Sequence, residues 1–210
     1  MATKFLDGEA RTAFKRAVET VENASAVEVV VAVRRRSGTY RHANVAVAAT
    51  IAFAGLAVML FSSHTFQLTS ILVDPFVVAL LAGGVVELLP IVKRLLTPLV
   101  TRHATVLRAA RATFVERGVH NTTGRSGLLV YISWLEQEVV LIADSGLARE
   151  LPEGDLQRFE ATLTAAVASG GAAVARGVEE LADAMGRAMP HRDDDVNELP
   201  DAVDSDMERP

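Results

Sequence analysis

The sequence lacks cysteine and any excess of positive charge, and these absences exclude several classes of site. Without cysteine there is no disulfide, no thiolate zinc site and no thiol nucleophile. The 21 Lys and Arg residues are outnumbered by 26 Asp and Glu residues, so the formal charge is −5 and no nucleic-acid partner is expected. The five histidines are scattered without metal-ligand spacing, and no Gly-rich phosphate loop or Gly-x-Ser-x-Gly motif occurs. The polar N-terminus has no apolar core of a secretory signal, so cleavage is not expected.

Two long apolar runs dominate what is present. Val45 to Ser62 carries no charge, and Ile71 to Val92 carries only Asp74 and Glu87. As helices of about 18 to 22 residues they would be roughly 27 to 33 Å long, which matches the hydrocarbon thickness of a bilayer. Two core helices of a soluble protein would normally show a polar stripe. We therefore predict a transmembrane helical hairpin over residues 43–92, with helices at about 45–62 and 71–92.

The charges around this hairpin predict its orientation. The loop from Ser63 to Thr69 has no Lys or Arg, whereas both outer flanks are basic. By the positive-inside rule both flanks, and hence both termini, face the cytoplasm of a multi-pass protein in the cell inner (plasma) membrane. The residues on which this depends are Arg34, Arg35, Arg36 and Arg41 before the hairpin, and Lys93, Arg94 and Arg102 after it.

Glu87 is a carboxylate inside the second apolar run. Carboxylates in membranes often mark proton or ion paths, so a transport role around Glu87 is one hypothesis. The other is that Glu87, near the cytoplasmic end, reaches towards Arg94 on the same helix face.

The remaining chain predicts an α/β body that the hairpin interrupts, with parts at 1–42 and 93–190. Acidic residues then crowd the segment 191–210, which predicts a disordered tail. Strands flanked by helices favour an α/β sandwich. The expected helices are Leu6–Glu22, Thr101–Arg117, Leu156–Ala168 and a last one to about Met189, and the expected strands are Ala26–Val33, Leu128–Ser133 and Val139–Ala143.

Several small motifs in this body resemble the TPM domain family. The motif residues are Phe114, Gly118, Thr122, Arg125 and Gly127 leading into Leu128–Ser133, then Val140–Asp144 with Gly146, together with Glu28 and the ending Met189-Pro190. The resemblance implies an α/β/α sandwich of the TPM type, here with an inserted two-helix transmembrane hairpin. It also implies one of three activities known among members: acid phosphatase activity, calcium binding, or assembly and repair of membrane complexes. The chain departs from the family pattern at Glu136-Gln137 and in the few acidic neighbours of Asp144.

The candidate ligand-binding residues are Asp144 at a strand end, and Arg125 with Thr123 or Ser126 on the loop before it. Asp144 is also the candidate metal ligand, for the calcium that the resemblance implies. The catalytic residues are not identified, because no nucleophile stands beside an evident base. The first hypothesis is a membrane-tethered binding or assembly and quality-control module that engages other membrane proteins. The alternative is a divalent-metal-dependent hydrolase resembling acid phosphatases.

Overall fold

The computed structural model describes residues 5–191, 197–200 and 202–207. The chain forms two compact units. The first comprises Met1–Ser37 and His103–Pro210, and the second comprises Gly38–Arg102. We call them the α/β unit and the hairpin unit, and each is described by itself.

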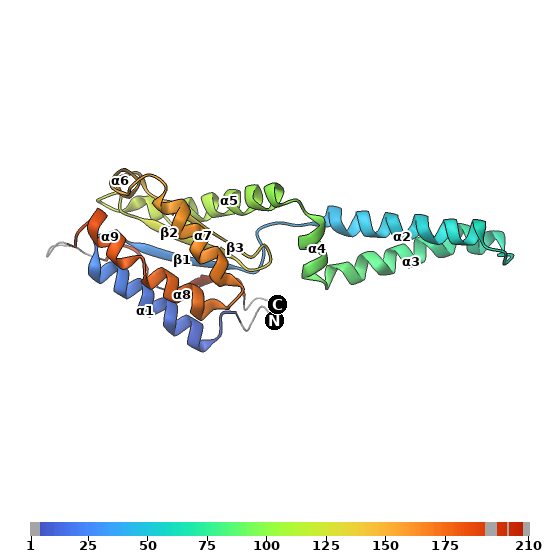
Figure 1. Ribbon diagram of the computed structural model, residues 1–210, viewed down its shortest axis with the longest axis horizontal. Coiled ribbons are helices and arrows are strands. Elements are labelled where there is room, and N and C mark those ends of the chain that lie inside the picture. Colours follow the sequence, from blue (N-terminus) through green and yellow to red (C-terminus); the bar gives the residue numbers. More distant parts are fainter. Residues whose placement is uncertain (1–4, 192–196, 201, 208–210) are drawn as a thin grey trace. The chain divides into compact units, whose positions relative to one another are not determined.

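A four-stranded mixed sheet forms the centre of the α/β unit (Figure 1). Its strands are β1 (Val29–Arg34), β2 (Leu128–Ser133), β3 (Glu138–Ala143) and β4 (Asp204–Ser205), in the order β3-β2-β1-β4. β1 runs parallel to β2 and β4, and β2 runs antiparallel to β3. The apolar, β-branched runs of β1 and β2 favour strands that are covered on both faces, as is typical of parallel pairs.

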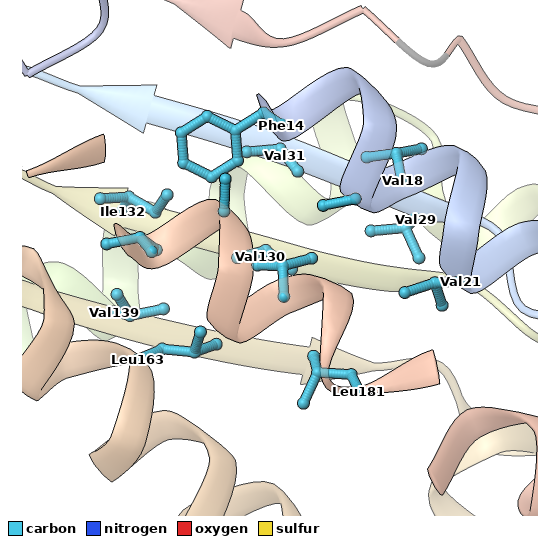
Figure 2. Close-up of a cluster of buried hydrophobic side chains, with 14 of the residues drawn as sticks. Phe14, Val18, Val21, Val29, Val31, Val130, Ile132, Val139, Leu163 and Leu181 are labelled. Carbon is cyan, nitrogen blue, oxygen red and sulfur yellow. The ribbon is translucent and has the colours of Figure 1, made fainter. Parts of the chain in front are cut away.

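Helices bury both faces of this sheet, because successive strand residues point to opposite sides. Val29, Val31 and Val33 join a cluster with α1 (Gly8–Ala24), α7 (Asp155–Val167), α8 (Gly171–Glu179) and α9 (Ala182–Ala188). Val30 and Ala32 join a second cluster with α5 (Leu99–Glu116). Figure 1 shows α1, α8 and α9 on one side of the sheet and α5 on the other, and Figure 2 shows the larger cluster. The prediction of an α/β fold is therefore confirmed.

α1 illustrates how the sequence builds one layer. Asp7 is its N-cap and accepts a hydrogen bond from the Ala10 N–H at 2.9 Å. Its buried residues recur every three or four positions, so one apolar stripe faces the sheet. In Figure 2 the side chains of Phe14, Val18 and Val21 meet those of β1.

The hairpin unit contains α2 (Arg41–Phe61), α3 (Leu68–Glu87) and the short α4 (Pro90–Leu96). α2 and α3 pack through small residues: a Cβ on Gly83 would lie 3.5 Å from the Cβ of Ala48. Both helices, of 21 and 20 residues, are long and apolar enough to cross a membrane.

Several elements differ from those predicted. The second apolar run is not one helix to Val92, since α3 ends at Glu87 and α4 starts at Pro90, a residue without a backbone N–H to continue the helix of the preceding turn. The predicted last helix is divided into α8 and α9. The structure also contains α6 (Ser145–Glu150) and the 3-10 turn η2 (Val119–Asn121), which the hydrophobic pattern did not predict.

The predicted disordered tail is a further correction. Within the described part of 191–210, Asp204 and Ser205 form β4, and Met207 is 5% exposed and belongs to the larger core cluster. Disorder was predicted from acidic charge, but Asp204 pairs with Arg34 and Arg117 of the α/β unit. The acidic residues 193–195 lie outside the described residues.

Candidate functional site

Arg125 and Asp144 meet at one edge of the sheet because β2 and β3 are antiparallel. The loop before β2 and the residue after β3 therefore lie side by side, and the Asp144 N–H donates to the Gly127 carbonyl at 2.8 Å. We call Thr122 to Gly127, together with Asp144, the loop site. The site lies at the edge where β1 and β2 begin, opposite the carboxyl ends of these two parallel strands, where α/β folds most often place ligands.

Asp144 has one oxygen that is used locally and one that is not. Its Oδ1 accepts a hydrogen bond from the Ser145 N–H at 2.6 Å and caps α6. Its Oδ2 is buried, lies 3.8 Å from Arg125 Nη1 and accepts no hydrogen bond from any described residue. A buried carboxylate oxygen in this state favours an incoming donor or cation.

Arg125 helps to form the loop and reaches solvent at its tip. Its backbone has a φ of 52°, and its carbonyl accepts the N–H groups of Gly146 at 3.0 Å and Leu147 at 3.1 Å. Its Nη1 donates to the His120 carbonyl at 3.0 Å, and 56% of its side chain is exposed. An anion at the surface could therefore contact the guanidinium without a rearrangement of the loop.

Gly127 of the loop site and Gly146 beside it allow backbones to approach closely. A Cβ on Gly127 would lie 2.0 Å from the Val119 carbonyl oxygen, and one on Gly146 would lie 2.5 Å from that of Gly124. Neither oxygen belongs to a flexible side chain, so a larger residue would force the backbone to move. The glycines of the TPM-like motifs thus have a packing role here.

The hydroxyl residues of the loop site are mainly structural. Thr122 Oγ1 accepts a hydrogen bond from the Ser126 N–H at 2.9 Å, and Ser126 is 5% exposed. The Thr123 N–H donates to the carboxylate of Glu198, at 2.9 Å to Oε2. Of the predicted ligand-binding residues, the structure brings Arg125 and Asp144 together, while the Thr123 backbone N–H binds Glu198 from the C-terminal segment.

Asp144 has few companions for a metal. Among the described residues, no group of three or more His, Cys, Asp or Glu side chains is placed to hold an ion. Oxygen-coordinated cations such as calcium take six to eight ligands, several of them carboxylates. The donor set at Asp144 does not fit a calcium site formed by the described residues.

A buried polar network that the sequence did not reveal lies at the opposite edge of the sheet. Ser133 Oγ donates to Glu136 Oε2 at 2.5 Å, and Ser37 Oγ lies 2.6 Å from Ser133 Oγ and 3.1 Å from the Tyr131 hydroxyl. The Ser37 N–H donates to Glu136 Oε1 at 3.0 Å. Burial raises the pKa of Tyr131, so its hydroxyl remains protonated. These contacts fasten the chain at Ser37, the last residue before the hairpin unit.

Glu87 lies in a polar cluster at one end of the hairpin unit. Lys93 Nζ lies 2.7 Å from Glu87 Oε1, and Asn44 Nδ2 donates to Glu87 Oε2 at 2.7 Å. Lys93 of α4 is thus a partner of Glu87, and it lies in the next helix because α3 ends at Glu87 and α4 begins at Pro90. Lys93 is 5% exposed, so the pair neutralises a buried cation.

Comparison with known proteins supports the fold. No protein-family model matches the chain, and no curated protein matches it. The NMR structure of the BA42 protein from the psychrophilic bacterium Bizionia argentinensis is similar, with a TM-score of 0.57. The alignment has 14% identity and covers 96% of this chain and 95% of that one. At this identity the likeness shows a shared fold and not a shared activity.

Proposed function

We propose that this is an integral membrane protein whose α/β unit is a TPM-like binding or assembly and quality-control module. In this proposal α2 and α3 cross the plasma membrane, both termini are cytoplasmic, and the partners are other membrane proteins. The proposal rests first on the surface of the hairpin unit.

Large apolar side chains point outward along both α2 and α3. Phe53 is 75% exposed, Phe61 is 89% exposed and Leu80 is 78% exposed. Burying each such side chain is worth about 1.5 to 3 kcal/mol, so a whole surface of them in water is strongly unfavourable. The buried residue of α2 is Ala43, and those of α3 are Pro75, Ala79 and Val86. Core helices of a soluble protein would be covered, whereas lipid-facing helices have this exposure.

The polar cluster supports a boundary at one end of these helices. Glu87 contacts both Lys93 and Asn44 next to the basic flanks, where side chains of a membrane protein reach the headgroups. An ion pair in this place anchors the hairpin and does not require a transport path.

A binding role is supported by the loop site. Its hydroxyls and glycines hold the backbone, and the donors at Asp144 are too few for a metal-activated water among the described residues. The TPM resemblance adds the class of partner, since members assist assembly and repair of membrane complexes.

The membrane topology is the first test. Because the chain has no cysteine, a single introduced cysteine is its only thiol and can be labelled selectively. Ser63→Cys in the α2–α3 loop and Ser169→Cys before α8 both replace exposed residues. With a membrane-impermeant maleimide on intact spheroplasts, we expect labelling at position 63 and labelling at 169 only after permeabilisation. Labelling of neither site before permeabilisation, or release of the protein by carbonate washing, would contradict the proposal.

One observation favours the second candidate, a divalent-metal-dependent acid-phosphatase-like hydrolase. It is the buried Asp144 Oδ2 beside Arg125. A ligand that binds only the folded protein raises its thermal midpoint. The binding-module proposal predicts that millimolar calcium leaves the midpoint unchanged. A rise that disappears in Asp144→Asn, which retains an N-cap acceptor, but persists in the exposed control Glu153→Gln would support the hydrolase.

A further inference from the structure

We call the described residues 197–200 and 202–207 the C-terminal segment. Its strand β4 pairs with β1 on the side of β1 that faces away from β2. Ala32 pairs with Asp204 and Val33 with Ser205 in parallel register. The Asp206 N–H donates to the Val33 carbonyl at 3.4 Å, and Asp206 Oδ1 accepts the Arg35 N–H at 2.7 Å. The segment thus uses the backbone of an edge strand as strand-adding peptides do.

Side chains make this contact selective for an acidic strand. The Asp204 carboxylate pairs with Arg34 and, at 2.6 Å, with Arg117 Nη2. Arg34 Nη1 also donates to the Asp204 carbonyl at 3.0 Å. Met207 follows and is buried in the core. The recognised pattern is an acidic residue, any residue, a second acidic residue and then an apolar residue.

Two β1 residues, Ala32 and Val33, pair with the described part of the segment. A cavity of about 540 Å³ remains between the segment and α1. Its walls include Arg11 and Lys15 of α1 on one side and Leu199 and Val203 on the other.

We propose that the β1 edge is a docking site for an extended acidic segment of a partner protein, and that Asp204–Met207 occupies it as an internal competitor. The partner segment would add in parallel to β1, place its first carboxylate between Arg34 and Arg117, and bury its apolar residue where Met207 lies. Exchange replaces the two β1–β4 residue pairs, the ion pairs of Asp204 and the burial of Met207 by the same contacts from the partner, while β1, β2 and β3 stay paired. This inference concerns the α/β unit alone and holds whether or not the hairpin crosses a membrane.

The test uses the full chain in detergent and a fluorescent peptide, AVDSDMERP, which has the sequence of residues 202–210. Binding is followed by anisotropy to the wild type and to Asp204→Asn/Asp206→Asn, in which the internal competitor is weakened. A tethered segment competes at about millimolar effective concentration, so we expect the peptide to bind the variant at least about tenfold more tightly. If the double variant has a lowered thermal midpoint, Asp206→Asn alone replaces it, with the same direction expected.

Two controls test the chemistry of the site. Adding Arg117→Ala to the variant should weaken peptide binding severalfold, since this arginine is half exposed and binds Asp204. Arg111→Ala, which replaces an exposed arginine of α5, the helix that ends just before Arg117, should leave it unchanged. A peptide with Asn at both acidic positions should bind weakly.

Equal binding to wild type and variant, or insensitivity to Arg117→Ala and to the Asn peptide, would overturn the proposal. Cross-linked dimers that exchange their own C-terminal segments would also overturn it, because the occupant would then be a second copy.

Discussion

Met207→Ala tests whether the end of the chain is folded onto the α/β unit. Met207 is 5% exposed and packs in the larger core cluster, although acidic residues surround it in the sequence. Truncation of a buried Met to Ala costs about 2 to 5 kcal/mol of unfolding free energy in a rigid core. This loss of unfolding free energy cannot exceed the free energy with which the segment docks on the α/β unit. The reason is that a short terminal strand can detach locally before the sheet unfolds.

We therefore expect the lower end of that range for Met207→Ala. A loss of about 2 kcal/mol corresponds to a fall in thermal midpoint of roughly 4 to 8 °C for a chain of this size. The measurement is the midpoint of the full chain in one detergent, by circular dichroism. Met185→Ala in α9 is the matched control: Met185 is fully buried and cannot escape by detachment, so its midpoint should fall at least as far. An unchanged midpoint for Met207→Ala beside a lowered one for Met185→Ala would refute the docked segment and restore the disordered tail.

Two further predictions concern the α/β unit. Gly127→Ala places a Cβ 2.0 Å from the Val119 carbonyl oxygen and should cost about 1 to 3 kcal/mol or more, seen as a lower midpoint, whereas Gly8→Ala, with nothing within 4 Å, should not lower it. Burial raises the pKa of Glu160, and the Leu141 N–H opposes this shift, so the folded state holds the proton more tightly than the unfolded chain. The associated stability is full below pH 4.5 and is lost as the pH rises through the folded pKa. The thermal midpoint of Glu160→Gln minus that of the wild type should therefore increase as the pH rises. The same difference in midpoint at all pH values would contradict this.

β1, β2 and β3 could be predicted because each buried strand is a short, continuous run of apolar residues in the sequence. β2 has the predicted bounds, Leu128 to Ser133, and all six residues are buried. A continuous apolar run bounded by turn residues has few alternatives. The long apolar runs likewise predicted α2 and α3, though not the break between Glu87 and Pro90.

The C-terminal segment was predicted wrongly because its stabilising partners are distant in sequence. Asp204 is neutralised by Arg34 and Arg117, and Met207 is a single apolar residue among charges. The average composition of such a segment predicts that it is solvated. The burial of Met207 and the pairing with β1 order it instead, and neither contact can be predicted from the neighbouring sequence.

The sequence predicted the residues of the loop site but not their contact or their position in the sheet. Asp144 and Arg125 were candidates from motif and turn chemistry, yet their meeting depends on the antiparallel pairing of β3 with β2. The same pairing sets them at the edge opposite the carboxyl ends of β1 and β2. At those ends Ser133 and Glu136 form a buried network with Ser37, which no sequence motif announces.

The sequence by itself determined the strands β1, β2 and β3 and the two helices that are apolar enough to cross a membrane, because both follow from side-chain hydrophobicity over short stretches of chain. Tertiary structure alone decided three pairings: Glu87 with Lys93, Arg125 with Asp144, and the C-terminal segment with the edge of β1. Each depends on a chain reversal or a strand register that brings distant residues together. The free energy of such contacts depends on distance in space, which a linear pattern does not encode.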